Sequence, residues 1–204
     1  MSGEPTAADS LAAWCDAVAL GNAAPAGGAV LGVVGALAAS LAAMAGRLTV
    51  GRPQYAACEH EFTALIGEAD ALRHTLLELA ERDSTAYAEV MAARGASRDT
   101  AARALERSSR LARALVDAAE VPLAILRAAG AAATLARRAA EAGSRSAAPD
   151  ARVGALLAEA VAIGARATAI GNLDAAERLD GAPVERIEAL RREMAVADAA
   201  DGGG

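Results

Sequence analysis

The sequence predicts an all-α protein, with one domain folded as an antiparallel helical bundle around a central Ala/Gly-rich helix and a long partner helix. Hydrophobic residues make up 54% of the chain but aromatic residues only 2%. Alanine, the strongest helix former, dominates, whereas the β-branched and aromatic residues that favour strands are sparse. At 204 residues the chain is long enough to bury one core.

Turn and capping residues divide the chain into seven expected helices. A turn from Pro25 to Gly28 leads into the central helix, and Pro53 ends it, because Pro lacks an N–H and restricts its predecessor. Val121-Pro122 is expected to break or kink the chain between two later helices. The expected helices cover about 9–20, 28–51, 54–94, 97–120, 122–141, 149–173 and 182–197. Residues 1–8 form a flexible N-terminus, 9–197 the helical domain, and 198–204 a disordered tail.

The central helix lies in a segment without charged side chains, between Asp16 and Arg47. A helix that is apolar on all sides is either a membrane span or the centre of a bundle. No aromatic belt or flanking cluster of basic residues marks a membrane boundary. The composition therefore favours a buried helix in a soluble protein, whose large side chains form one stripe at Leu37, Leu41, Met44 and Leu48.

The charged residues exclude several classes of protein. The net charge of −6 argues against nucleic-acid binding, which depends on neutralising phosphates. Every cation is an arginine, which excludes Schiff-base and P-loop lysines. Cys15 and Cys58 belong to no C-x-x-C motif, and the N-terminus is polar and acidic. We therefore expect a cytoplasmic protein without a signal peptide.

The two histidines do not predict a metal site. His60 and His74 lie on one expected helix, about 21 Å apart along its axis. Asp70, four residues before His74, would either orient that imidazole or form an exposed helical ion pair, which we favour. We expect neither a metal nor a cofactor.

Three features are candidates for chemistry or binding. The turn containing Gly27 and Gly28 brings free N–H groups and the positive end of a helix to one point, so it is either an anion site or a plain tight turn. Asp83 lies in the middle of the long helix, where burial would raise its pKa towards the range of a general base; the alternative is a solvated carboxylate. A stripe of arginines would either receive an anionic ligand tail or form a solvated face with nearby acids. It consists of Arg103, Arg107 and Arg110.

Taken together, these motifs resemble the formiminotransferase-cyclodeaminase C-terminal family, which includes small bacterial methenyltetrahydrofolate cyclohydrolases. The segment from Ala24 to Tyr55 is similar to the family's opening signature, a Pro-x-Gly-Gly turn, an Ala/Gly-rich helix and a Leu-Thr-x-Gly motif. Later matches follow in order along the chain, at Asp83 with Ala86 and Tyr87, Pro122-Leu123, Asp150 and Asn172-Leu173.

The resemblance implies hydrolysis of 5,10-methenyltetrahydrofolate to 10-formyltetrahydrofolate without a metal. It implies that Asp83 is the general base and that Asp150 stabilises the cationic substrate. It also implies a homodimer that binds a folate-type small molecule, whereas the charge and composition described above predict binding to neither nucleic acid nor membrane. The substrate-binding residues implied are Pro25, Gly27, Gly28, Arg52, Tyr55 and Asn172.

Departures from the family pattern leave alternatives open. Ala26 and Ala29 replace a glycine and a serine of the turn, Pro53 interrupts the basic stretch, and Ser144 stands where an asparagine is usual. The alternatives are a formimidoyltetrahydrofolate cyclodeaminase, an enzyme acting on another cyclic imine or amidine in specialised metabolism, and a non-catalytic dimeric helical partner.

Overall fold

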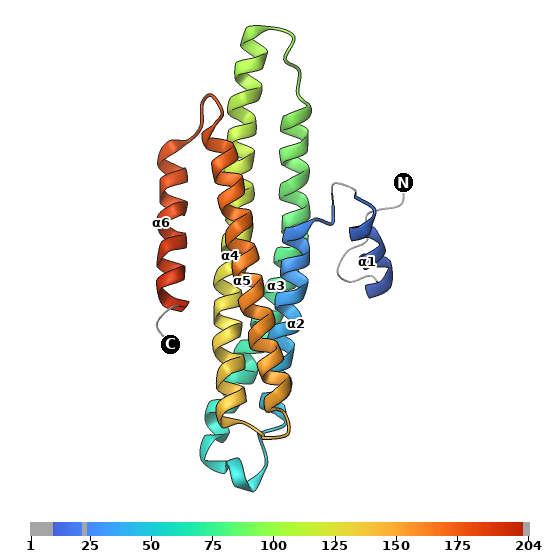
Figure 1. The fold of residues 1–204 in the computed structure, drawn as a ribbon, viewed down its shortest axis with the longest axis vertical. Coiled ribbons are helices and arrows are strands. Elements are labelled where there is room, and N and C mark those ends of the chain that lie inside the picture. Colours follow the sequence, from blue (N-terminus) through green and yellow to red (C-terminus); the bar gives the residue numbers. More distant parts are fainter. Residues whose placement is uncertain (1–9, 22–23, 202–204) are drawn as a thin grey trace. The chain divides into compact units, whose positions relative to one another are not determined.

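The computed structural model describes residues 10–21 and 24–201, and in these residues it contains helices and no β-strand. The predicted all-α fold is thus confirmed (Figure 1). The helices are α1 (Leu11–Ala19), α2 (Gly27–Arg47), the 3-10 helix η1 (Pro53–Cys58), α3 (Glu59–Gly95), α4 (Ala101–Ala142), α5 (Ala148–Glu177) and α6 (Val184–Asp201).

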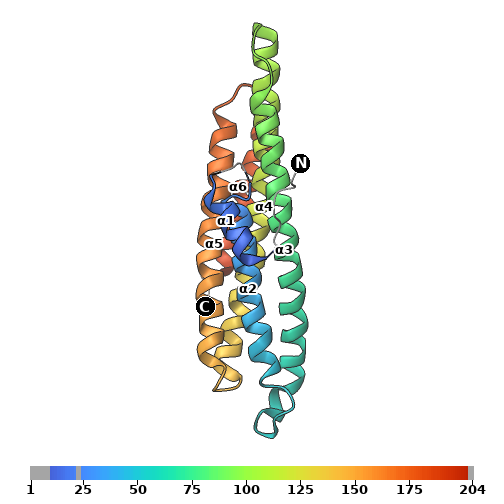
Figure 2. The same ribbon diagram turned by 90° about the vertical axis from the view of Figure 1, so that its right-hand side faces the viewer.

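The chain forms two compact units. The first unit comprises the described residues up to 30 together with 79–124 and 164–201, and the second comprises residues 31–78 and 125–163. Helices α2, α3, α4 and α5 each contribute a segment to both units. In the first unit, the end of α3 and the start of α4 run side by side, joined by the turn at residues 96–100 (Figures 1 and 2).

In the second unit, α2 is the buried helix that its composition predicts. Ala38, Ala39 and Ala42 are completely inaccessible to solvent. They pack in clusters with alanines of α4 and α5, which include Ala132, Ala136, Ala155 and Ala158. The helices are also close at Gly46 of α2, where a Cβ would lie 2.7 Å from Ile66 Cγ1 of α3. Close approach of the helices thus replaces large side chains as the source of packing.

Within the described ranges 10–21 and 24–201, three helices are long and apolar enough to cross a membrane, judged by length and composition alone: α2, α4 and α5. The most apolar stretch of α2 is 61% buried inside the protein, and that of α5 is 33% buried. Such apolar segments are buried either in lipid or against other helices of the protein. That the protein is soluble stays a prediction.

The break or kink predicted at Val121-Pro122 does not divide two helices, because α4 is one helix of 42 residues with Pro122 inside it. Proline in a helix interior removes a hydrogen bond and costs about 3 kcal/mol or more. Val121 and Leu123 on either side are only 4% and 2% exposed, and Pro122 is fully buried. Burial of this apolar segment offsets the unfavourable proline, so a boundary prediction based on local propensity was wrong.

Other helix boundaries differ by a few residues. Ser10 caps α1, accepting a hydrogen bond from the Ala13 N–H at 3.3 Å. Helix α2 ends at Arg47, before the expected Gly51, which adopts a φ of +77° in the turn that follows. Helix α6 extends to Asp201, beyond the expected end at residue 197. The flexible N-terminus predicted for residues 1–8 and the glycines at 202–204 lie outside the described residues.

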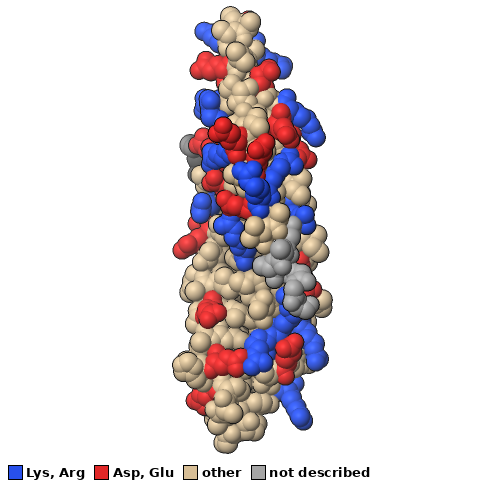
Figure 3. Space-filling model, turned by 90° about the vertical axis from the view of Figure 1, so that its left-hand side faces the viewer, with Lys and Arg blue, Asp and Glu red and all other residues tan. Residues whose placement is uncertain are grey.

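Helix α6 is held in the first unit by ion pairs. Arg186 donates to Asp117 at 2.6 Å and to Glu120 of α4, and Arg191 donates to Asp174 of α5 at 2.7 Å. Arginines and carboxylates are interspersed on the face shown in Figure 3. This mixture is typical of a solvated surface rather than of one that binds phosphates.

Candidate active site

In the first unit, the start of α2 meets a carboxylate from α3. Helix α2 begins at Gly27, and its first-turn N–H groups have no partner within the helix. The N–H of Ala29 donates a hydrogen bond to Asp83. Gly28 lies so close to this carboxylate that a methyl group on its Cα would be 2.0 Å from Asp83 Oδ1 and 2.5 Å from Oδ2. The structure thus brings together Asp83 and the predicted glycine turn, and any side chain at position 28 would displace the carboxylate.

The environment of Asp83 differs from that of its charged neighbours. Glu78, Glu81 and Arg82 are exposed, whereas Asp83 is partly buried. Burial raises the pKa of Asp83, and the hydrogen bond from Ala29 opposes this effect without cancelling it. In its ionised form, a carboxylate with a raised pKa is a better proton acceptor than one with the ordinary pKa. Of the two interpretations open from the sequence, the structure supports the partly buried one.

Asn172 lies in the same unit, on α5. Its side-chain amide donates to the carbonyl of Ala118 on α4 at 3.3 Å. Ala118 and Ala86 line a hollow of about 420 Å³ between α3 and α4. Ala86 lies one helical turn after Asp83 on the same side of α3, although Asp83 itself does not line the hollow.

The second unit contains the other predicted residues. Arg52 Nη1 donates to Ser144 Oγ at 3.1 Å, and the N–H of Arg145 donates to the Tyr55 hydroxyl at 3.1 Å. The N–H of Ser144 donates to Thr49 Oγ1 at 2.8 Å, and the Thr49 hydroxyl donates to the carbonyl of Ala45 at 2.8 Å. Both Thr49 and Ser144 are at most 1% exposed. These bonds fix the loop between α4 and α5 against the segment that follows α2.

Sequence reasoning missed this network. The family resemblance implies that Arg52 and Tyr55 hold substrate, and in the sequence Ser144 is only a departure from the family pattern. The signal that was available is the polar Ser144-Arg145-Ser146 segment after Gly143, at the point where two long apolar helices must turn. Backbone groups in such a buried turn need side-chain partners, and the Thr49 and Tyr55 hydroxyls supply them.

Gly143 provides a stability test of this loop. A Cβ there would lie 2.5 Å from the Ala139 carbonyl oxygen and 2.9 Å from Thr49 Oγ1. We expect Gly143→Ala to lower the free energy of unfolding by about 2–3 kcal/mol, or the melting temperature by roughly 5–10 °C. Gly67→Ala on α3 is the matched control, since nothing lies within 4 Å of its Cβ and alanine is the better helix former. Equal melting temperatures for both variants would contradict the packing described.

Asp150 lies in the first turn of α5 and is exposed. It belongs to the second unit, whereas Asp83 belongs to the first. The predicted residues thus form two groups. Gly27, Gly28, Asp83 and Asn172, with Pro25, belong to the first unit, and Arg52, Tyr55 and Asp150 belong to the second.

The histidines take no part in either group. His60 and His74 are exposed, and Asp70 accepts hydrogen bonds from Arg47 and Arg73 rather than from His74. The hydrogen bond from Arg47 holds the pKa of Asp70 below its ordinary value. Among the described residues, no three His, Cys, Asp or Glu side chains lie together as a metal site.

Comparison with known proteins shows similarity along most of the chain. A family model described as formiminotransferase-cyclodeaminase matches residues 10–193. A methenyltetrahydrofolate cyclohydrolase from Methylorubrum extorquens is 30% identical over 193 residues, which cover 94% of this chain and 91% of that protein. The formimidoyltransferase-cyclodeaminase of Rattus norvegicus is 34% identical over 114 residues, covering 56% of this chain and 21% of that protein.

A solved structure is also similar. The crystal structure of a formiminotetrahydrofolate cyclodeaminase from Thermotoga maritima superposes with a TM-score of 0.82 at 28% identity, covering 96% of this chain and 91% of that one. Similarity along nearly the full length, in sequence and in fold, confirms the resemblance inferred from the motifs. The chain belongs to the formiminotransferase-cyclodeaminase family.

Proposed function

We propose that this enzyme hydrolyses 5,10-methenyltetrahydrofolate to 10-formyltetrahydrofolate, with Asp83 as the general base. The observation that carries the proposal is the partly buried Asp83 carboxylate, held at the start of α2 by the Ala29 N–H and packed against Gly28. The proposal is supported by the Methylorubrum extorquens relative, which is a methenyltetrahydrofolate cyclohydrolase and matches nearly the full chain.

The chemistry needs a proton acceptor near an electrophilic carbon. In the substrate, the carbon between N5 and N10 belongs to an amidinium cation and is already activated for attack. A water molecule forms a bond to this carbon while Asp83 takes one of its protons. The hydroxyl then loses its remaining proton as its oxygen forms the C=O bond, the bond from the carbon to N5 breaks, and the formyl group stays on N10. N5 takes up one proton, so that of the two protons of water one ends on N5 and one is released. Because the cation itself activates the carbon, the reaction asks for no metal or cofactor.

The remaining predicted residues keep their roles as proposals. Pro25 and Gly27 shape the entry into α2, and Asn172 is held by Ala118 in the same unit as Asp83. Arg52 and Tyr55, proposed to hold the substrate, also have the structural task of fixing the loop at Ser144 and Arg145. Stabilisation of the cationic substrate by Asp150 remains a prediction.

The cyclodeaminase reaction is the second candidate, favoured by the Thermotoga maritima structure and the Rattus norvegicus relative. In that reaction N10 attacks the formimino carbon on N5, ammonia leaves, and the methenyl compound forms. The same carboxylate would take the proton of N10. An enzyme acting on another cyclic amidine and a non-catalytic helical partner are the further alternatives.

Two assays separate these functions. Methenyltetrahydrofolate absorbs in the near ultraviolet, and we expect its absorbance to decay faster with the protein than in buffer. In the second assay, formiminotetrahydrofolate is the substrate and release of ammonia is measured. Ammonia release without faster decay would favour the cyclodeaminase. Neither activity, together with no shift in melting temperature on adding folate, would favour the non-catalytic partner or another substrate.

We also propose that the protein is a cytoplasmic homodimer. In the second unit, α5 exposes Val153, Leu156 and Ile163, which are 49%, 65% and 73% accessible and lie on one helical stripe. Exposed apolar side chains of this size favour burial against a second copy of the same surface, as in a twofold dimer, and Glu159 beside them is already paired with Arg137 at 2.8 Å. Cytoplasmic location is supported by Cys15 and Cys58, which form no disulfide.

Sedimentation of the purified protein tests the homodimer. We expect a mass twice that of the chain, and a shift towards the monomer for Leu156→Glu, because a buried charge at a dimer contact is costly. Glu in place of the exposed Ala131 on α4 is the control, since that position is outside the α5 stripe. A monomer for the unmodified protein would contradict the proposal.

A further inference from the structure

We propose that Arg110 and Arg113 bind the glutamate carboxylates of the substrate, with the aminobenzoyl ring seated on the alanines between α3 and α4. The inference rests on the proposed function, since it names the part of the molecule that binds the far end of a folate. It assigns the anionic tail to the first unit, which also contains Asp83, rather than to Arg52 in the second unit.

The hollow between α3 and α4 has an apolar floor and a basic rim. Ala86, Ala114 and Ala118 line it together with Arg110 and Arg113. Ala118 is buried and Ala86 and Ala114 are partly buried, whereas both arginines are exposed. A flat aromatic ring fits small apolar side chains, and guanidinium groups bind carboxylates through two parallel hydrogen bonds.

Arg110 and Arg113 are available to a ligand. Neither makes a hydrogen bond or an ion pair within the part of the chain that the structure describes, whereas Arg103 pairs with Asp99 at 2.7 Å. Arg107 donates to the carbonyl of Arg94 at 2.9 and 2.7 Å. The arginine stripe seen in the sequence is therefore divided. Its N-terminal members stabilise the end of the α3–α4 hairpin, and Arg110 is left for binding.

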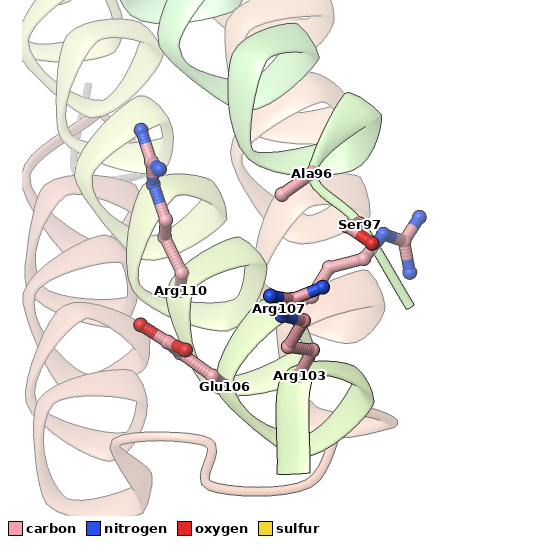
Figure 4. A pocket seen from close by; sticks show the side chains of 6 residues that line it. All are labelled: Ala96, Ser97, Arg103, Glu106, Arg107 and Arg110. Atoms are coloured by element: carbon pink, nitrogen blue, oxygen red, sulfur yellow. The ribbon is translucent and has the colours of Figure 1, made fainter. Parts of the chain in front are cut away.

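Arg110 also connects two hollows. It lines the first with Ala86 and a second, of about 190 Å³, with Ala96 and Ser97 at the end of α3. Figure 4 shows Arg103, Glu106, Arg107 and Arg110 projecting from α4 in this second hollow. The basic rim thus continues along α4 beyond the alanine floor. It reaches Ala96 and Ser97, which lie farther along the chain from Asp83 than Ala86 does.

The spacing along α3 matches the length of the substrate. From Asp83 through Ala86 to Glu89 the helix rises about 9 Å. The aminobenzoyl and glutamate groups extend a folate by roughly 10 Å, about three extended residues. A pterin placed with its reactive carbon at Asp83 therefore brings its carboxylates to the level of Arg110 and Arg113.

Acidic side chains in the hollow oppose this binding to different degrees. Asp117 lines it but pairs with Arg186 at 2.6 Å, so its charge is largely compensated. Glu89 also lines it and makes no ion pair with another described residue. Glu89 therefore weakens the attraction for an anion, and its removal should have the opposite effect to removal of an arginine.

The test compares Michaelis constants for two substrates: methenyltetrahydrofolate and methenyltetrahydropteroate, which lacks the glutamate. For the folate we expect Arg110→Ala and Arg113→Ala each to raise KM by roughly 2- to 5-fold, and the double variant by about 10-fold, with kcat unchanged. Glu89→Gln should lower the KM for the folate. None of these variants should change KM for the pteroate. The effect on the folate should also weaken at high salt.

Arg178→Ala is the matched control, because it removes one exposed arginine that lines neither hollow. Melting temperatures verify that each variant is folded. If the protein hydrolyses the folate but the Arg110→Ala and Arg113→Ala variants behave like Arg178→Ala, the tail site is overturned and the proposed function stands. If the protein hydrolyses neither compound, both proposals fall together.

Discussion

Asp83→Asn is expected to lower the rate of methenyltetrahydrofolate hydrolysis by about a hundredfold or more, because a positioned general base contributes roughly 10²- to 10⁴-fold. Asparagine has nearly the same shape and still accepts the hydrogen bond from the Ala29 N–H, but it does not take up a proton from water. The measurement is the initial rate of absorbance decay, with the rate in buffer subtracted. A variant as fast as the unmodified protein would contradict the assignment of Asp83.

Asp83→Asn is expected to lower the rate but to raise the stability relative to the unmodified protein as the pH rises. Burial raises the pKa of Asp83 above its ordinary value of 3.8, so the folded protein favours the protonated form. Stability that depends on this proton is present at low pH and is lost as the pH rises from 3.8 through the folded-state pKa. Relative to Asp83→Asn, the unmodified protein should therefore become less stable over this range. Denaturant unfolding at several pH values measures it.

Gly28→Ala is expected to lower the rate by roughly 10- to 100-fold while leaving the helices intact. The new methyl group would lie 2.0 Å from Asp83 Oδ1, so the carboxylate must move, and a displacement of about 1 Å costs as much as 10²-fold in rate. Far-ultraviolet circular dichroism and the melting temperature check the fold, and the absorbance assay measures the rate.

Gly27→Ala, at the neighbouring position, is the control for this prediction. Nothing lies within 4 Å of a Cβ at Gly27, and alanine keeps the backbone N–H through which Gly27 is proposed to bind, so we expect near-normal activity. Loss of activity in both variants would show that the turn needs glycine for its backbone rather than for the approach of Asp83. No loss in either would mean that the position of the carboxylate does not matter for the reaction.

Much of the fold could be predicted because local signals and burial agree. The uncharged Ala/Gly-rich segment predicted a buried helix, and the alanines at 38, 39 and 42 are inaccessible. At Pro122 they disagree, since local propensity predicts an interruption and tertiary burial keeps α4 continuous. Helix breakers in a fully buried segment are therefore weaker evidence for a boundary than those at the surface.

Less of the candidate site could be predicted. The meeting of Asp83 with Gly28 followed from family motifs rather than from spacing, because no local rule relates residues on different helices. The tasks of Arg52 and Tyr55 depend on a loop 90 residues away in sequence, at Ser144 and Arg145. Arg110 and Arg113 could be separated from Arg103 only once their partners were known, since all three have similar acidic neighbours in sequence.

A crystal structure of the protein with bound 5-formyltetrahydrofolate, a stable compound of the substrate class, tests the central claim most directly. The measurement is the distance from the one-carbon unit to the nearer Asp83 carboxylate oxygen. We predict that this distance is about 3 Å if the two groups are in direct contact. It is about 5–6 Å if a single water molecule, hydrogen-bonded to the carboxylate, lies between them. A one-carbon unit bound away from Asp83, with the pterin outside the first unit, would contradict the account.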